Sequence, residues 1–190
     1  MSLIADYGFV LLILACAFGF FMAWGVGAND VANAMGTSVG SRALTIKQAI
    51  IVAMIFEFCG AYLAGGEVTE TIKNGIVDAE VISPDLMVLG MMSALLAAGT
   101  WLMIATMKGW PVSTTHSIIG AVIGFAAVGV STDAVHWEAI GPIVASWVVT
   151  PMLSGVVAFG LFMSVQKLII NTDHPFENAK RFVPLYMFLT

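Results

Sequence analysis

Long hydrophobic blocks alternate with short polar stretches along this chain, and the alternation predicts membrane-spanning helices. An α-helix rises about 1.5 Å per residue, so about 20 apolar residues cross the hydrocarbon core of a bilayer. The apolar blocks cover residues 7–26, 46–64, 86–107, 112–130 and 139–165. The pattern therefore predicts an all-α integral membrane protein with about five transmembrane helices, forming a single domain over residues 1–190.

Two interruptions predict broken or re-entrant helices. The first block runs on through Gly27-Ala28-Asn29-Asp30 into a weakly apolar stretch, residues 31–39. Together they are too long for one crossing, so we expect the helix to break near Gly25, Gly27 and Asn29. The second interruption is the sequence Lys108-Gly109-Trp110-Pro111, between the third and fourth blocks.

The segments between and after the blocks are polar. Residues 66–85 and 131–138 are expected to form loops, and residues 167–181 a polar tail, followed at 182–190 by the start of another helix. Residues 1–7 contain no Lys or Arg, which a cleaved signal peptide would need, so the first block is expected to be retained as a span.

Composition supports the membrane assignment. Hydrophobic residues make up 59% of the chain and charged residues 10%, whereas soluble domains have about 45–50% and about 25%. There is no basic patch of the kind that binds nucleic acid. Cys16 and Cys59 both lie in apolar blocks, where cysteine is usually a small packing residue, so they indicate no redox compartment.

The basic and acidic residues predict an orientation, because Lys and Arg concentrate in cytoplasmic loops. With five crossings, the bases on one side are Arg42, Lys47, Lys108, Lys167, Lys180 and Arg181. The other side receives Asp6, Glu67, Glu70, Asp78, Glu80, Asp85, Asp133 and Glu138, with Lys73 as its single base. The N-terminus is therefore expected outside the cytoplasmic membrane and the C-terminus in the cytoplasm.

Two carboxylates inside the apolar blocks are candidate functional groups, since ionisable residues within spans are costly. They are Asp30, at the expected helix break, and Glu57, near the middle of the second block. Asn29, Asp30 and Asn33 offer the oxygen ligands that hard cations prefer. A protonatable carboxylate could carry H⁺ instead, and the residues alone leave both alternatives open.

A second polar cluster, Pro111-Val112-Ser113-Thr114-Thr115-His116, predicts an anion site. Proline commonly starts a helix, and the hydroxyls that follow would lie beside free backbone N–H groups at the positive end of the helix dipole. His116 would either orient a neighbour or support the anion. The pairs Gly36/Gly40 and Gly120/Gly124 are expected to allow close helix packing.

In these two clusters the chain resembles the inorganic phosphate transporter (PiT) family. The matching segments are residues 27–34, continuing through 36–40, and residues 111–116, with the Phe56-Glu57 pair and the stretch 66–75 also similar. The resemblance implies two inverted halves, each carrying the motifs, with phosphate held between them beside coupling ions. Family members use Na⁺ or H⁺, and the first motif looks closer to the Na⁺-coupled branch.

The resemblance also implies roles for individual residues. Phosphate would be bound by Ser113, Thr114, Thr115, Asn33 and Asp30, and the coupling ion by Asp30, Asn29, Asn33 and Glu57, with His116 in support. Because the chain ends where the second half should begin, we expect a fragment, a separate partner polypeptide, or a dimer of opposite orientations, which the charge bias disfavours.

The sequence thus predicts ion-coupled transport of inorganic phosphate by alternating access, with the bilayer and a second transporter half as partners, no further cofactor, and homo-oligomerisation left open. A sulfate or other oxyanion permease is a rival of the same class. Rivals of other classes are an intramembrane hydrolase using Ser113 or Thr114 with His116 and Asp30, and a scaffold without a site. We expect no enzymatic activity.

Overall fold

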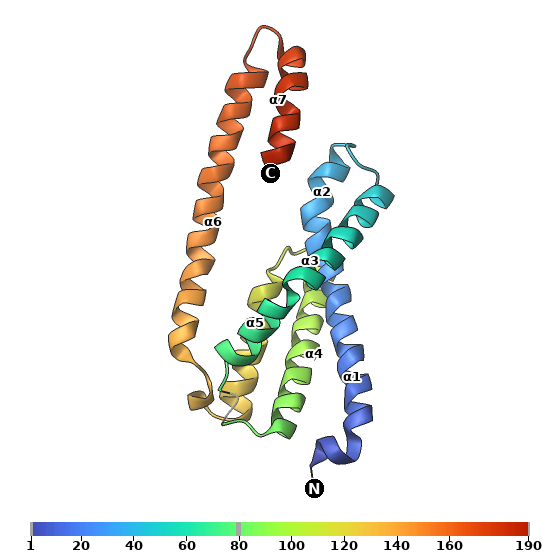
Figure 1. Ribbon diagram of the computed structural model, residues 1–190, viewed down its shortest axis with the longest axis vertical. Coiled ribbons are helices and arrows are strands. Elements are labelled where there is room, and N and C mark those ends of the chain that lie inside the picture. Colours follow the sequence, from blue (N-terminus) through green and yellow to red (C-terminus); the bar gives the residue numbers. More distant parts are fainter. Residues whose placement is uncertain (1, 79–80, 190) are drawn as a thin grey trace. The chain divides into compact units, whose positions relative to one another are not determined.

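A computed structural model describes residues 2–78 and 81–189 and shows helices joined by short connections (Figure 1). The chain forms two compact units, residues 1–139 and residues 140–190. Glu80, which the sequence assigns to the acidic side, lies outside the described residues. The first unit holds both sequence clusters and is described first.

The first unit begins with a helical segment of 38 residues, kinked at Tyr7 and called the rod from here on. The rod consists of α1 (Leu3–Val26), a π-helical turn η1 (Gly27–Val31) and α2 (Ala32–Gly40). The expected break is therefore wrong. The backbone stays in the right-handed helical region at Val26 and Ala32, and no proline precedes Pro84, so i→i+5 hydrogen bonding accommodates the irregularity without unwinding.

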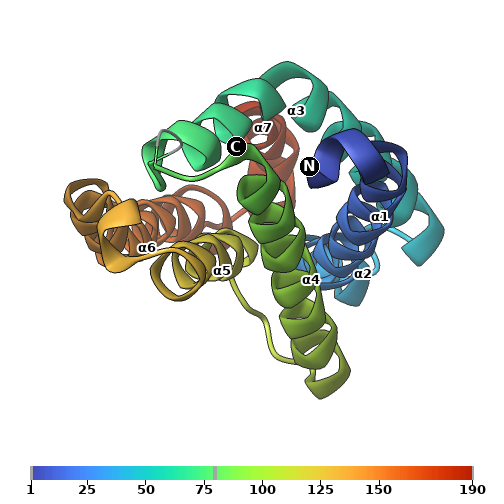
Figure 2. The same cartoon turned by 90° about the horizontal axis from the view of Figure 1, so that it is seen from below.

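The second helix, α3 (Ile46–Gly75), starts at a capping box formed by Thr45 and Gln48. It runs obliquely past the rod and continues about ten residues beyond the apolar block (Figures 1 and 2). The loop expected from residue 66 is thus largely helical. Its Glu, Thr and Lys residues are polar, but none of them stops a helix as proline would.

The helices α4 (Pro84–Lys108) and α5 (Thr114–Gly129) form an antiparallel hairpin (Figure 1). Ser83 caps α4 by accepting the Leu86 N–H, and Pro84 occupies the first turn. At the other end Gly109 has φ +69°, the left-handed conformation that ends a helix and that glycine adopts without a β-carbon clash. The interruption predicted at residues 108–111 is therefore the turn at the tip of the hairpin.

The rod and α4 run side by side in the same direction (Figure 2). At their starts the Asp85 carboxylate accepts hydrogen bonds from the Ser2 hydroxyl and from the backbone N–H groups of Leu3 and Ile4, at 2.9–3.1 Å. These are free donors at a helix N-terminus, where a carboxylate is favourable. Asp85 therefore fixes the relative register of α1 and α4.

Glycines bring the helices of this unit close together, but not at the expected positions. A β-carbon at Gly99 would lie 2.7 Å from Phe21, one at Gly25 would lie 3.0 Å from Leu102, and one at Gly90 would overlap the Phe125 ring. At Gly36, Gly40, Gly120 and Gly124 an added β-carbon would meet nothing within 4 Å. The expected small-residue contacts are thus wrong within this chain, because those glycines face away from its helices.

The connections after α3 and after α5 meet at one end of the unit. Val77 and Val135 form an isolated antiparallel bridge, with hydrogen bonds from Asp78 N–H to the Ala134 carbonyl and from His136 N–H to the Ile76 carbonyl. The short 3₁₀ turn η2 (Thr132–Ala134) belongs to this connection. Both ends of the hairpin therefore lie at the end of the unit where Asp85 holds the start of α1.

The second unit consists of most of α6 (Trp137–Val165), a π-helical turn η3 (Gln166–Ile170) and α7 (Pro175–Leu189). Pro142 and Pro151 lie inside α6. The hydroxyls of Ser164 and Tyr186 are 2.6 Å apart and join α6 to α7. The tail expected to be polar is thus partly helical, and the last helix begins at Pro175 rather than near residue 182.

Within the described residues, four helices are long and apolar enough to cross a membrane: Leu3–Gly40, Ile46–Glu67, Pro84–Lys108 and Trp137–Ile170. The fourth predicted crossing, α5, has 16 residues and would extend about 24 Å, short of the roughly 30 Å hydrocarbon core. The all-α membrane fold is confirmed, with one predicted crossing shorter than a full span.

Candidate functional site

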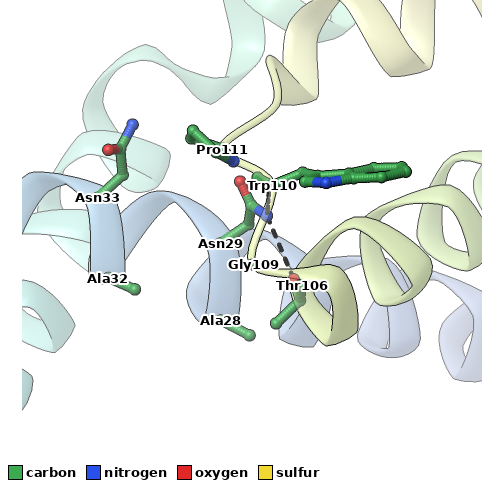
Figure 3. Close-up of a pocket in the computed structure, with 8 residues that line it drawn as sticks. All are labelled: Ala28, Asn29, Ala32, Asn33, Thr106, Gly109, Trp110 and Pro111. Atoms are coloured by element: carbon green, nitrogen blue, oxygen red, sulfur yellow. Dashed lines mark hydrogen bonds between the residues drawn. The ribbon is translucent and has the colours of Figure 1, made fainter.

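The two polar clusters of the sequence meet at the tip of the α4–α5 hairpin. The tip, residues 109–113, lies against the π-helical turn of the rod (Figure 3). Segments about 80 residues apart in the chain are therefore joined at this point. We call this the tip junction: residues 28–33 of the rod together with residues 106–117 of the hairpin.

Asn29 ties the tip to the rod. It is 7% exposed, and its amide nitrogen donates to the Thr106 hydroxyl at 3.2 Å and to the Trp110 carbonyl at 3.0 Å. Its amide oxygen accepts the Val112 N–H at 3.2 Å. Both N–H bonds of the side chain are thus used, which satisfies a buried amide that would otherwise be costly.

The neighbouring carboxylate, Asp30, contacts the start of α5. The Thr114 hydroxyl donates to Asp30 Oδ2 at 2.9 Å. Ser113 caps the same helix, because its side chain accepts the His116 N–H at 3.2 Å. The structure therefore brings the carboxylate of the first sequence cluster next to the two hydroxyls and the helix N-terminus of the second.

A cavity of about 360 Å³ opens beside Asn29 and its partners in the hairpin. Asn29 and Asn33 line it from the rod and Thr106 from α4, and the other lining residues are Ala28, Ala32, Gly109, Trp110 and Pro111. Asn33 projects from the helical turn after Asn29 (Figure 3). The cavity thus offers amide and hydroxyl groups on an otherwise apolar wall, within one helical turn of Asp30.

The remaining predicted residues lie on open surfaces of this unit. Asn33, Thr115 and His116 are exposed, as is Glu57, which lies eleven residues after the start of α3. Glu57 is not among the residues lining the cavity. The structure therefore assembles Asn29, Asp30, Ser113 and Thr114, leaves Asn33 at the cavity, and does not bring Glu57 to the tip junction.

Sequence reasoning missed two participants. Thr106 accepts a hydrogen bond from Asn29, and Trp110 contributes its carbonyl to the same amide. The Trp110 indole lies 6.4 Å from the ring of Trp101 on α4. Thr106 is a single hydroxyl residue within an apolar block, which is not unusual for a membrane helix. Trp110 contributes a backbone carbonyl, which every residue has. Neither residue could therefore be recognised from the sequence.

The tip junction offers oxygen ligands of the kind that hard cations prefer. They are the Asp30 carboxylate and the Asn33 amide, since the Asn29 oxygen already accepts the Val112 N–H. In the part of the chain that the structure describes, no group of three or more His, Cys, Asp and Glu residues could hold a metal ion.

Long apolar helices define the class of the protein: a multi-pass helical membrane protein, with polar side chains gathered at the tip junction. Three comparisons with known proteins specify the class further. A family model described as the phosphate transporter family matches residues 26–190. The chain belongs to this family.

Relatives agree with the family model. A "Putative phosphate permease" of Haemophilus influenzae is 55% identical over 192 residues, covering 100% of this chain and 46% of that protein. "Inorganic phosphate transporter 2-1, chloroplastic" of Arabidopsis thaliana is 46% identical, covering 90% of this chain and 30% of that protein. The chain thus spans less than half the length of these relatives.

A solved structure has the same fold. It is described as "the sodium-dependent phosphate transporter", and it superposes with a TM-score of 0.83 at 45% sequence identity. The match covers 90% of this chain and 42% of that one. The helical membrane fold predicted from the sequence is therefore that of a phosphate transporter.

Proposed function

We propose that this chain is one half of a carrier that moves inorganic phosphate across the cytoplasmic membrane together with a cation. The observation that carries the proposal is the contact between the Thr114 hydroxyl and the Asp30 carboxylate, 2.9 Å apart, at the N-terminus of α5. This contact combines groups suited to an anion and a group suited to a cation in one place.

The start of α5 supplies the anion-binding groups. Free backbone N–H groups and the positive end of the helix dipole favour an oxyanion, and hydroxyls add further donors. Ser113, Thr114 and Thr115 are the hydroxyl residues at this helix start. In the proposed cycle they bind the phosphate oxygens, and Asn33 reaches them from the cavity wall with its amide, with His116 in support.

The Asp30 carboxylate explains why a cation must accompany phosphate. Two negative groups side by side in a low-dielectric site repel each other by several kcal/mol, so either Asp30 is protonated or a cation lies between them. Na⁺ held by Asp30 and neighbouring amide oxygens meets this requirement, and so does H⁺ on the carboxylate. The solved relative described as sodium-dependent favours Na⁺.

The exposed polar groups support a second half. Asn33, Glu57 and Thr115 lie on open surfaces of this chain, and polar side chains that face lipid are costly. In the proposed transporter a second inverted half covers them, Glu57 contributes to coupling, and the two halves alternate access to the site. The relatives, at about two to three times this length, have room for such a half.

The test is radiolabelled phosphate uptake into proteoliposomes, with this chain alone and with its second half. Uptake should require both halves and an imposed Na⁺ gradient, and unlabelled phosphate should compete while sulfate should not. Uptake driven by a pH gradient without Na⁺ would replace Na⁺ by H⁺ and leave the rest of the proposal standing.

Two results would contradict the proposal. Sulfate uptake without phosphate uptake would assign the site to another oxyanion. Absence of any uptake, together with hydrolysis of an ester or peptide that depends on Ser113 or Thr114, would assign the site to an enzyme instead.

A further inference from the structure

The hydrogen-bonding pattern of Asn29 separates it from its neighbour Asp30. Asp30 contacts the start of α5. Asn29 donates one amide N–H to Trp110 and accepts the Val112 N–H in the hairpin tip, and it donates its other amide N–H to Thr106 at the end of α4. Two consecutive residues of one π-helical turn therefore contact the 109–113 connection and the residue that follows it, Thr114. The position of the α5 start relative to Asp30 depends on what Asn29 holds.

Thr106 is the side-chain partner that completes this arrangement. Its hydroxyl accepts one amide N–H of Asn29 at 3.2 Å, from the last turn of α4. The other two partners of Asn29 are backbone groups of Trp110 and Val112, which any residue would supply. Of these three contacts of Asn29, the one that depends on side-chain identity is therefore that with Thr106.

We propose that Thr106 is a positioning residue for phosphate binding: by fixing the Asn29 amide, it holds the hairpin tip so that Thr114 meets Asp30. This inference rests on the proposed function. Thr106 touches neither Asp30 nor the α5 hydroxyls through any contact described above. It acts on them through Asn29 and the 109–113 connection.

Loss of the hydroxyl should loosen the tip without removing any proposed ligand. Valine has nearly the shape of threonine, so Thr106→Val leaves one N–H of a 7% exposed amide without its acceptor. The tip can then move relative to Asp30, so part of the free energy of phosphate binding is used to order the tip. We expect a weaker apparent affinity for phosphate with a largely unchanged maximal rate.

Three variants test this in the chain assembled with its second half. Thr106→Val should raise the KM for phosphate roughly three- to tenfold, the range that follows from one lost hydrogen bond, with a maximal rate within about twofold. Thr106→Ser keeps the hydroxyl and should restore the original KM. Thr100→Val is the matched control, because Thr100 lies on the same helix, is exposed, and donates to the Leu96 carbonyl within that helix.

Hydrogen–deuterium exchange gives a second readout that needs no transport. The Val112 N–H is bonded to Asn29, so peptides containing residues 110–113 should exchange faster in Thr106→Val. The Thr106→Ser and Thr100→Val variants should exchange like the unmodified protein. Faster exchange together with a raised KM in Thr106→Val supports the inference.

The contradicting outcomes are distinct. An unchanged KM in Thr106→Val overturns the inference, even if exchange is faster, because the contact then only shapes the fold. Unchanged exchange at residues 110–113 overturns it as well. Absence of phosphate uptake by the unmodified protein would instead refute the proposed function, and the inference would fall with it.

Discussion

At the residue scale, the tip junction divides its chemistry between two neighbours in the sequence. Asn29 is buried and bonded to the hairpin, while Asp30 is half-buried and reaches the start of α5. The Asn29 side chain both donates a hydrogen bond to the hairpin backbone and accepts one from it. The Asp30 carboxylate can only accept hydrogen bonds. Structural and ionic roles therefore fall on different side chains of the motif.

The charge of Asp30 should be essential for transport but not for folding. In Asp30→Asn the amide oxygen can still accept the Thr114 hydroxyl, so the contact persists while the negative charge is lost. Charged hydrogen bonds are worth about 1.5–3 kcal/mol, so we expect phosphate uptake to fall roughly 10- to 100-fold. The measurement is initial uptake rate in proteoliposomes.

Asp133→Asn, on the exposed η2 turn, serves as the matched control and should transport normally. The melting temperature of Asp30→Asn should stay near that of the unmodified protein. Full transport by Asp30→Asn would rule out a role for this carboxylate in cation coupling.

At the element scale, helix packing in this unit depends on glycines that face large side chains. Gly90 faces the Phe125 ring between α4 and α5, and Gly99 faces Phe21 between α4 and α1. Without a strong hydrophobic driving force between helices in lipid, such close approach supplies much of their attraction. The packing of α4 against α5 and α1 at these glycines therefore supports the hairpin tip, in addition to the hydrogen bonds of Asn29.

Gly90→Ala should destabilise the hairpin. The new methyl group would overlap the Phe125 ring, and overpacking of this kind costs roughly 1–3 kcal/mol. Thermal unfolding in detergent should show a lower melting temperature. Gly120→Ala on α5 is the control, since an added β-carbon there meets nothing within 4 Å and alanine favours a helix.

A second substitution checks the cause. Replacing Phe125 by Leu in the Gly90→Ala background removes part of the ring and should recover some of the lost stability. Equal melting temperatures for Gly90→Ala and Gly120→Ala would show that the backbones can separate at this point without loss.

At the scale of the whole molecule, the α4–α5 hairpin bears on the expected topology. Both of its ends lie where α1 begins, as the Asp85 contacts and the Val77–Val135 bridge show. A hairpin whose ends share one side adds either two crossings or none. The predicted orientation therefore does not depend on whether α5, with 16 residues, crosses the membrane completely.

The orientation can be tested with single cysteines, after Cys16 and Cys59 have been replaced by alanine. Asp133→Cys should react with a membrane-impermeant thiol reagent added to intact cells, because acidic loops are expected outside. Arg42→Cys should react only after permeabilisation, since it follows the rod on the basic side. The reverse labelling pattern would invert the predicted orientation.

The sequence by itself determined the class of protein, and it indicated the two polar clusters that the structure brings together. Apolar block length fixes a helical membrane protein, because backbone polar groups in lipid must bond within helices. The carboxylate in the rod and the hydroxyls after Pro111 stood out, since charge and hydroxyl clusters are rare and costly in such blocks. These features are local, so they can be read along the chain.

The tertiary structure decided what depends on partners distant in sequence. It showed that the rod passes through a π-helical turn instead of breaking, and that Asn29 is hydrogen-bonded to Thr106, Trp110 and Val112. It also showed that Gly90 and Gly99, and not the expected glycine pairs, face large side chains. Spacing along one helix cannot reveal which face meets another helix, because that choice is made only when the helices pack.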